Sequence, residues 1–329
     1  MELAGATALV TGAGGFIGSH LVEALVSAGA RVTAMIHYDA RSDCANLDLL
    51  PAPVREAIDV ISGNIEDPFF VSSAVAGKEV VFHLAALIAI PYSYIAPASF
   101  IRTNVEGTLN VLEACRTHKP RRLIHTSTSE TYGTAQYTPI DERHPLQGQS
   151  PYAASKIGAD KLAESYHLSF DVPVTTIRPF NTYGPRQSAR AVIPTIVSQA
   201  LSLPEIRIGA LTPLRDLTFV RDTVAGFLAA ASTDACVGQV VNVGNGSAIS
   251  IGDLAALVLR VVGVDKPLVE DRQRLRPEKS EVRTLLCDAQ KFRSLSGWAP
   301  QVGLESGLAE VVSFVRSQPD RYRPATYMR

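Results

Sequence analysis

Residues 6–20 have the sequence ATALVTGAGGFIGSH, and this stretch decides the fold of the chain. The apolar run from Ala6 to Val10 is typical of a short buried strand. Gly12, Gly15 and Gly18 follow at even spacing, and a helical pattern of apolar residues comes after them. A strand, a glycine turn and a helix start in this order present backbone amides and a helix dipole to a pyrophosphate. The stretch therefore predicts a dinucleotide-binding turn, although ordinary tight turns share the pattern.

Strand-like runs recur at residues 6–10, 31–36, 58–62, 80–84, 123–126 and 174–177. Helical patterns lie between most of them, for example at residues 103–117 and 155–168. Strands that alternate with helices form a parallel, doubly wound sheet. The predicted fold class is therefore α/β, of the Rossmann type.

The pattern of residue types along the chain changes after Pro179. Short strands, prolines and arginines dominate residues 180–214 and the part after Asp265, whereas residues 222–231 and 239–243 are typical of a helix and a strand. We expect a Rossmann domain over residues 1–178, to which residues 216–243 return. A smaller, interleaved α/β domain for the substrate is expected over residues 179–215 and 244–329.

Composition narrows the class of protein. The chain has 329 residues, of which 46% are hydrophobic and 19% charged, and its formal net charge is −1. This balance gives no reason to expect nucleic acid or a membrane as a partner. The cysteines are scattered, without metal-binding spacing, and no signal peptide or apolar span is recognised, so we expect a cytoplasmic enzyme without a metal. The four cysteines are Cys44, Cys115, Cys236 and Cys287.

Tyr152 and Lys156 stand four residues apart in the run SPYAASK, where Ser150 and Pro151 suit a helix cap and first turn. Residues with this spacing share one helix face, so the ammonium can approach the phenol. A nearby positive charge stabilises a phenolate, and we therefore expect Lys156 to lower the pKa of Tyr152 and make it a usable acid/base. Taken alone, the pair also suits an exposed helix.

Polar residues follow the predicted strand at residues 123–126. Thr128, Ser129 and Glu130 should stand at its carboxyl end, where active groups of open parallel sheets gather. Thr128 is placed to orient a substrate hydroxyl that Tyr152 deprotonates. Glu130 adds a carboxylate that a simple alcohol dehydrogenase does not need. The alternative is that these residues only cap the strand.

Together these motifs resemble the extended short-chain dehydrogenase/reductases that act on sugar nucleotides. The likeness covers nearly the whole chain and includes HLAA at residues 83–86, NVEGT at 104–108, RPFNTYGPR at 178–186 and RDLTFV at 215–220. It implies that Thr128, Tyr152 and Lys156 form the catalytic triad and that the protein is a homodimer. The implied cofactor contacts are Gly12, Gly15, Phe16, Ile17, Gly18, Asn64, Ile65, Leu84, Ala85, Ala86, Asn104, Tyr152 and Lys156.

The second predicted strand bears on the choice of cofactor. An NAD site usually has an acid at the end of this strand, but Ile36 stands there by the family's pattern. His37 and Arg41 follow closely and suit a 2′-phosphate. We expect NADP in preference to NAD, tightly bound and recycled, although Asp39 offers a carboxylate for a ribose.

Ser129 and Glu130 bear on the reaction. After oxidation of a sugar at C4, a carboxylate can remove the acidic C5 proton, water leaves from C6, and hydride returns to C6. We expect such a 4,6-dehydratase, with Glu130 acting at C5. The Thr-Ser-Glu tripeptide resembles that of GDP-mannose 4,6-dehydratases, but UDP-glucuronate decarboxylases share it. The motifs also suit a 4-epimerase or a non-catalytic NADP-sensing protein.

Longer stretches resemble GDP-N-acetylglucosamine 4,6-dehydratases most. They are residues 85–94, 147–152, 186–194 and 274–282. Leu87, Ile88 and Ile90 form an apolar wall that suits an acetamido methyl group, or they are simply core. Arginines suit a diphosphate, with a solvated charge run or a surface ion pair as the alternative. The expected substrate contacts are Ser93, Asn181, Arg190, Val192, Arg215 and Arg276.

Overall fold

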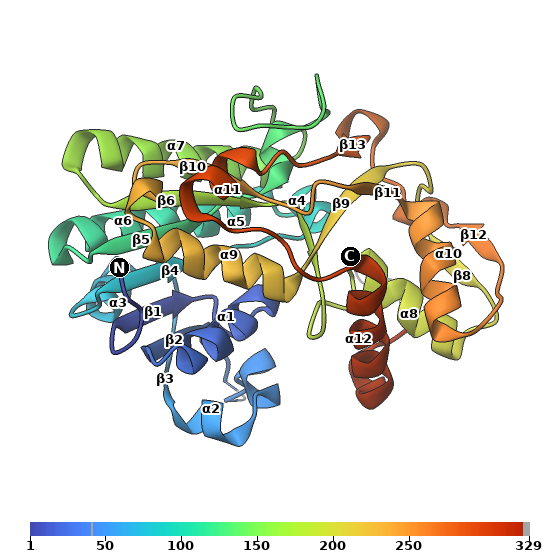
Figure 1. The fold of residues 1–329 in the computed structure, drawn as a ribbon, viewed down its shortest axis with the longest axis horizontal. Helices are drawn as coiled ribbons and strands as arrows, with labels where there is room; N and C mark the ends of the chain where they lie inside the picture. The colour runs from blue at the N-terminus through green and yellow to red at the C-terminus, as the bar shows by residue number, and fades with distance from the viewer. Residues whose placement is uncertain (41, 325–329) are drawn as a thin grey trace.

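A seven-stranded parallel sheet forms the centre of the larger part of the molecule in the computed structural model, which describes residues 1–40 and 42–324 (Figure 1). The strand order is β3-β2-β1-β4-β5-β6-β10, and it reverses between β1 and β4. The predicted Rossmann-type α/β fold is confirmed. The strands are β1 (Thr7–Thr11), β2 (Arg31–His37), β3 (Ile58–Gly63), β4 (Val80–His83), β5 (Arg122–Thr126), β6 (Val174–Pro179) and β10 (Val240–Val243).

Strands β1, β4 and β6 are buried at nearly every position because helices cover both faces of the sheet. In β1, Ala8 and Val10 pack with α1 (Phe16–Ser27) and α9 (Val220–Ser232). Leu9 between them faces the opposite layer of α3 (Pro68–Val75), α6 (Gly107–His118) and α7 (Pro151–Phe170). The carboxyl ends of the strands are therefore the exposed edge at which a site can form.

The helix predicted at residues 103–117 begins earlier and is interrupted. It consists of α5 (Pro97–Phe100), a π-helical segment η2 (Ile101–Glu106) and α6. The π-helical turn places Asn104 in the protein interior, where it is almost fully buried. Such turns concentrate at functional sites.

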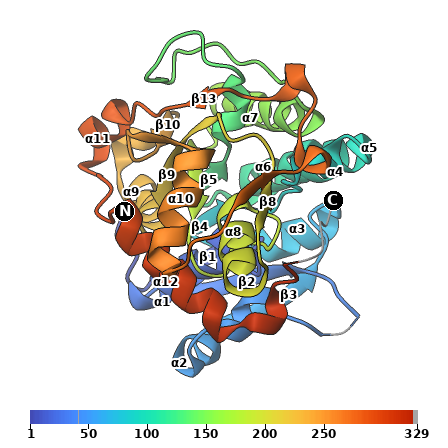
Figure 2. The ribbon, with the colours of Figure 1, turned by 90° about the vertical axis from the view of Figure 1, so that its right-hand side faces the viewer.

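The second part of the molecule carries the remaining strands (Figure 2). β9 (Leu214–Phe219) pairs with β7 (Asn181–Tyr183), β11 (Ala248–Ser250) and β13 (Thr284–Leu285), while β8 (Ile206–Ile208) pairs with β12 (Leu268–Glu270). Helices α8 (Val192–Ser202), α10 (Ile251–Val262) and α12 (Leu304–Ser317) pack on one another. The chain returns to the seven-stranded sheet with α9 and β10 before it enters β11.

The shorter elements complete the fold. They are η1 (Ala45–Leu49), α2 (Ala52–Glu56), α4 (Ile90–Ser93), η3 (Ser129–Tyr132), η4 (Asp234–Cys236), η5 (Arg272–Arg274), η6 (Glu278–Ser280), α11 (Gln290–Ser296) and η7 (Pro319–Arg321). Within the described residues, none of the helices has the length and apolar character needed to cross a membrane.

Candidate active site

Helix α7 carries the predicted acid/base pair. The Ser150 hydroxyl caps the helix by accepting from the Ala153 amide at 3.1 Å, and Pro151 occupies the first turn. Tyr152 and Lys156 both lie on the buried face, with 7% and 4% of their surfaces exposed. The Tyr152 ring meets the edge of Phe100 at a centroid distance of 6.2 Å. The exposed-helix alternative is therefore wrong.

The expected lowering of the Tyr152 pKa is not found. Burial raises the pKa of Tyr152 above its ordinary value, and the negative charges of Glu130 and Asp160 raise it further. A hydrogen bond from Thr128 opposes this shift without cancelling it. The prediction considered the charge of Lys156 but not the loss of water around a buried phenolate. Thr128 and Tyr152 are nevertheless brought together, as the motif implies.

Lys156 is itself perturbed by its surroundings. Burial lowers its pKa to about 8, and Asp160 acts in the opposite direction. Desolvation disfavours an ammonium, and a nearby carboxylate restores part of that loss. Lys156 therefore titrates within the range in which enzymes are assayed.

Asp160 is a site residue that the sequence analysis missed. Its carboxylate accepts from the Ser127 hydroxyl at 2.6 Å and from His125 Nε2 at 3.1 Å. Arg178 donates to it through Nε at 3.2 Å and Nη2 at 2.9 Å. The available signal was its position four residues after Lys156, which repeats the spacing from Tyr152 to Lys156.

Glu130 lies in a cluster of opposite charges. Its carboxylate is 3.8 Å from Arg276 Nη1, which is also 3.9 Å from the carboxylate of Glu281. Arg215 is 7% exposed and donates to Glu281 at 2.9 Å. Arg215 is thus buried rather than part of a surface ion pair, whereas Arg276 is half-buried in a charge run of mixed exposure. Glu281, which the sequence analysis did not single out, holds the two arginines together.

A cavity of about 310 Å³ has Phe100, whose ring contacts Tyr152, in its wall. Leu87 and Ile88 form an apolar side, and Arg190 stands at the same cavity. The other lining residues are Ala86, Ala89 and Tyr92.

Two predicted members of this cavity are placed differently. Ile90 packs in a buried cluster with Phe100 and Tyr152, so it belongs to the core. Ser93 is fully buried, and its hydroxyl donates to the Ile90 carbonyl at 2.7 Å. The one-turn helix α4 turns both side chains inward, which sequence spacing did not indicate.

Hydrogen bonds join segments that are far apart in the sequence near the amino end of α7. The Tyr94 and Ser280 hydroxyls are 2.5 Å apart, and Ser280 donates to the Gln149 carbonyl at 2.7 Å. Gln149 Nε2 in turn donates to the Lys279 carbonyl at 3.1 Å. Three of the four stretches that carry the specific resemblance therefore meet here, and the fourth contributes Arg190 to the neighbouring cavity.

Two further predicted substrate contacts lie in the segment after β6. Asn181 begins β7, and its Oδ1 atom is buried without a hydrogen-bond partner among the described residues. A buried amide oxygen without a partner is costly, and a ligand donor would satisfy it. Val192 is half-buried at the first position of α8.

The glycine turn fits a dinucleotide. Gly12 has a φ of +70°, and a Cβ there would lie 2.8 Å from the Ala85 nitrogen, so the turn is pressed against the end of β4. A Cβ on Gly18 would lie 2.2 Å from the Gly12 oxygen, which fixes the close approach of α1. The amides of Phe16, Ile17 and Gly18 in the first turn of α1 precede the first bond of the helix, from the Ser19 amide to the Gly15 carbonyl, and are available to a pyrophosphate.

Most of the remaining predicted cofactor residues lie at or just after the carboxyl ends of β2, β3 and β4. His37 ends β2 and is exposed, whereas Arg41 lies outside the described residues. Asn64 is exposed just after β3, and Ile65 is buried beneath it. Asn104 exchanges hydrogen bonds with the Leu87 backbone at 2.8 and 2.9 Å and donates to the Ser155 hydroxyl at 2.9 Å. Leu84, Ala85 and Ala86 follow β4 directly.

Comparison with known proteins agrees with this geometry. The family model described as GDP-mannose 4,6 dehydratase matches residues 9–311. The chain belongs to this family. A dTDP-glucose 4,6-dehydratase of Actinoplanes sp. is 33% identical over 318 residues, which cover 94% of this chain and 97% of that protein. A UDP-glucose 4-epimerase of Mycolicibacterium smegmatis is 34% identical over 317 residues, which cover 94% and 98%.

A solved structure shows the same fold. The dTDP-glucose 4,6-dehydratase DesIV from Streptomyces venezuelae, with NAD and TYD bound, aligns with a TM-score of 0.85 and 27% identity over 97% of this chain and 100% of that one. Relatives of this dehydratase family thus include both dehydratases and epimerases. The residues at the site, rather than overall similarity, must therefore distinguish the reaction.

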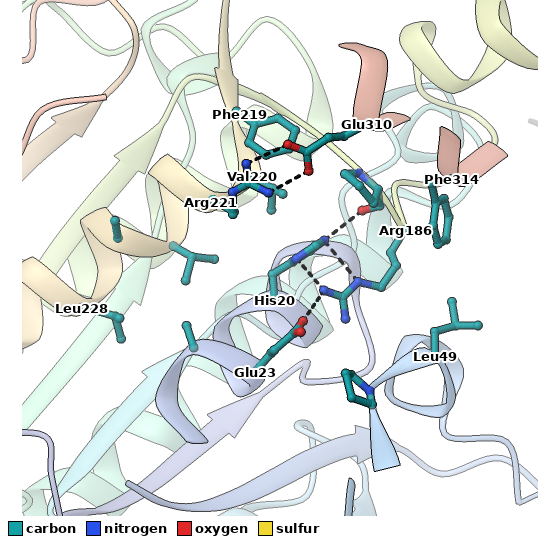
Figure 3. A pocket seen from close by; sticks show the side chains of 15 residues that line it. His20, Glu23, Leu49, Arg186, Phe219, Val220, Arg221, Leu228, Glu310 and Phe314 are labelled. Carbon is teal, nitrogen blue, oxygen red and sulfur yellow. Dashed lines mark hydrogen bonds and ion pairs between the residues drawn. The ribbon is translucent and has the colours of Figure 1, made fainter. Parts of the chain in front are cut away.

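A separate cavity of about 660 Å³ lies between α1, α9 and α12 (Figure 3). Its charged side chains pair with each other: Arg186 bonds to Glu23 at 2.7 Å, and Arg221 to Glu310 at 2.7 Å. Burial and the charge of Arg186 lower the pKa of His20 to about 3. None of the proposed catalytic side chains lines this cavity.

Proposed function

We propose that this protein is a nucleotide-sugar 4,6-dehydratase that produces a 4-keto-6-deoxy sugar nucleotide. The observation that carries the proposal is the position of Glu130, whose charge acts on Tyr152 and whose carboxylate faces Arg276. A second carboxylate beside the acid/base tyrosine is needed for elimination but not for oxidation alone. Its proximity to the arginine pair supports a substrate that carries phosphate.

Oxidation at C4 uses the residues of α7 and β5. Tyr152 takes the proton of the C4 hydroxyl, and the Thr128 hydroxyl bonds to the phenol oxygen and stabilises the phenolate. Lys156 supplies positive charge on the same helix face. A nicotinamide bound here would supply the redox chemistry, as acceptor of the C4 hydride and its donor to C6. Gly12, Gly15 and Gly18 would hold its pyrophosphate.

Elimination is assigned to Glu130. The C4 ketone makes the C5 proton acidic, and the Glu130 carboxylate removes it. The same proton passes to the departing C6 hydroxyl, so that one water leaves and a C5–C6 double bond remains. Hydride would then add at C6 while C5 takes up one proton, which equals the one that Tyr152 took from the C4 hydroxyl, so the sugar loses one water in all. Tyr152 keeps the C4 oxygen oriented throughout. Ser129 is buried where many glucose-nucleotide dehydratases have an aspartate, so Glu130 serves as both base and acid.

The proposed substrate is GDP-N-acetylglucosamine. Leu87 and Ile88 form the apolar side of the cavity and suit an acetamido methyl group. Arg190, Arg215 and Arg276 supply cations for the diphosphate, and Asn181 offers an amide oxygen without a partner. Mass spectrometry after incubation with GDP- and UDP-linked sugars tests this, and the loss of one water from GDP-N-acetylglucosamine without added cofactor is the expected result.

A 4-epimerase is the second candidate, because the UDP-glucose 4-epimerase relative is as similar as the dehydratases. Epimerisation has no chemical need for Glu130. Glu130→Gln should abolish water loss if the protein is a dehydratase and spare turnover if it is an epimerase. Unchanged product mass with altered chromatography would favour the epimerase, and loss of carbon dioxide from UDP-glucuronate would favour a decarboxylase. Absence of turnover on every sugar would favour an NADP sensor.

NADP is the proposed cofactor, although DesIV was solved with NAD. Two features support this: Ile36 stands where an acid is usual, and the exposed His37 follows it. Chromatography of the nucleotide released from denatured protein, with titration of both cofactors, tests the preference. Tighter binding of NAD would reverse it.

We also propose a homodimer, as the family likeness implies. The monomer has a mass of 35.2 kDa. Light scattering coupled to size-exclusion chromatography should give twice this mass at micromolar concentration, and a monomer mass would reject the proposal.

A further inference from the structure

The buried face of α7 carries a carboxylate directly after the acid/base pair. Tyr152, Lys156 and Asp160 follow at intervals of four residues, and all three are buried. Among the described residues, Asp160 is the carboxylate whose charge acts on the Lys156 ammonium. The arrangement places a fixed negative charge one helical turn beyond Lys156.

Residues on and next to the strands of the sheet bond to the Asp160 carboxylate and fix its position. His125 on β5 and Ser127 just after that strand donate to its two oxygens, and Arg178 on β6 donates twice. Arg178 also donates to the Tyr132 hydroxyl at 3.1 Å, which donates to Asn242 Oδ1 at 2.7 Å. Although burial alone would raise the pKa of Asp160, these partners lower it to about 2. The carboxylate is therefore both immobile and charged at neutral pH.

The groups around Lys156 make this charge necessary. The Lys156 charge acts on His83 of β4 and His125 of β5, and burial lowers the pKa of both imidazoles, so they are neutral at pH 7. Arg178 on β6 is a cation. Without the Asp160 charge, the ammonium would stand in a buried site beside neutral rings, which favours its deprotonation, and Arg178 would lose its counter-ion.

We propose that Asp160 is a positioning residue for the reaction: its carboxylate stands one helical turn beyond Lys156, and its bonds anchor α7, which carries Lys156, to the strand end that precedes Thr128 and Glu130. The inference deepens the proposed function and rests on it where Lys156 assists Tyr152. Asp160 touches neither the sugar nor the nicotinamide in this scheme. Its contribution passes through Lys156.

The test is a pH titration of the Lys156 Nζ resonance in protein labelled with ¹⁵N-lysine, assigned with Lys156→Arg. In Asp160→Asn the proton affinity of Lys156 should fall at least tenfold. Ser127→Ala is the matched control, because it removes a buried bond to Asp160 but leaves the charge, and Lys156 should titrate as in the wild type.

Asp160→Asn leaves Arg178 without its counter-ion, so the double variant Asp160→Asn/Arg178→Gln is measured beside it in case the single variant does not fold. The same fall in proton affinity is expected there. Wild-type titration of Lys156 in a folded variant that lacks the Asp160 charge would reduce Asp160 to a structural residue and overturn the proposal. Product analysis is separate: a wild type that releases no water would reject the dehydratase, while the titration would still test Asp160.

Discussion

At the scale of single residues, burial controls the chemistry of this site. Tyr152 and Lys156 are both withdrawn from water, and burial disfavours the charged form of each. The Thr128 hydroxyl and the Asp160 carboxylate act in the opposite direction on Tyr152 and Lys156, respectively. The pKa values of Tyr152 and Lys156 are therefore set by burial and by neighbouring residues. The effect of the Lys156 charge on Tyr152, which the spacing suggested, is not found.

Removal of the Tyr152 hydroxyl tests its role as acid/base. Tyr152→Phe keeps the ring that packs on Phe100, so the fold should be retained. Turnover should fall by about 100- to 10,000-fold, as for the loss of a general acid/base. Steady-state kinetics measure the loss, and unchanged thermal unfolding is the control. A smaller fall, with the variant still folded, would assign the proton transfer to another group.

The pH dependence of turnover tests Lys156. Its pKa of about 8 means that the ammonium is present below this value and lost above it. Turnover should therefore fall about tenfold for each pH unit well above 8. Rates measured from pH 6 to 10 give the profile, with circular dichroism to verify folding. Since arginine stays protonated, the alkaline fall should disappear from the residual activity of Lys156→Arg; its persistence would assign the fall to another group.

At the scale of elements, two helix starts position the site. The start of α7 is fixed by the Ser150 cap and Pro151, so Tyr152 stands in the first turn. The start of α1 is fixed by glycine, because the helix approaches the Gly12 carbonyl more closely than a Cβ permits. Each helix start depends on one or two neighbouring residues, so a single substitution can test it.

Ser150→Ala should destabilise the protein by about 1 kcal/mol, because the Ala153 amide loses its acceptor. Urea unfolding measures the change. Ser150→Asp retains a capping oxygen and is the matched control. Equal losses in both variants would show that the hydroxyl acts other than as a cap.

Gly18→Ala should cost about 1–3 kcal/mol, as overpacking does, and should weaken cofactor binding. The added Cβ would meet the Gly12 oxygen at 2.2 Å, and either the turn or the helix must move. Gly252→Ala in α10 is the control, because its Cβ would have only ordinary contacts, from 3.6 Å outward. Calorimetric titration with the nicotinamide cofactor and urea unfolding measure the two effects. Equal affinity in both variants would contradict the assignment of the turn.

At the scale of the whole molecule, Asp216 joins the two sheets. It lies on β9, yet it accepts from the amides of Asn245 and Gly246 at 2.8 Å, just after β10, and from the Cys287 amide at 3.1 Å. Burial raises its pKa to about 6 despite these bonds. Asp216 thus connects the seven-stranded sheet with the strands that support Arg215 and Glu281.

This raised pKa predicts a pH-dependent stability. The folded state binds the proton more tightly, so the stabilisation is complete below the unfolded pKa of about 4 and is lost as pH rises through about 6. The difference in unfolding free energy between wild type and Asp216→Asn should shrink by on the order of 2 kcal/mol from pH 4.5 to 7.5. Urea unfolding at both pH values measures it. A difference independent of pH would show that Asp216 is ionised throughout.

The sequence by itself determined the sheet and the cofactor turn. Apolar runs of strand length, glycines at a strand end and a capped helix are local signals, because backbone conformation and burial pattern leave their mark within a few neighbouring residues. The strands at residues 31–37, 58–63 and 174–179 thus begin where predicted. The proximity of Thr128 to Tyr152 was also foreseen, because the family resemblance implies that the two residues act together.

Only the tertiary structure decided which charges meet and how far each group is removed from water. Glu130 and Arg276 are far apart in the chain, and no spacing rule pairs them. Arg178 and Asp160 lie on a strand and on a helix, so no spacing rule pairs these two either. The direction of the Tyr152 pKa shift and the inward turn of Ser93 likewise depend on burial, which neighbouring segments supply. Solvation and charge are properties of the assembled site, because both depend on groups that the fold brings together from distant parts of the chain.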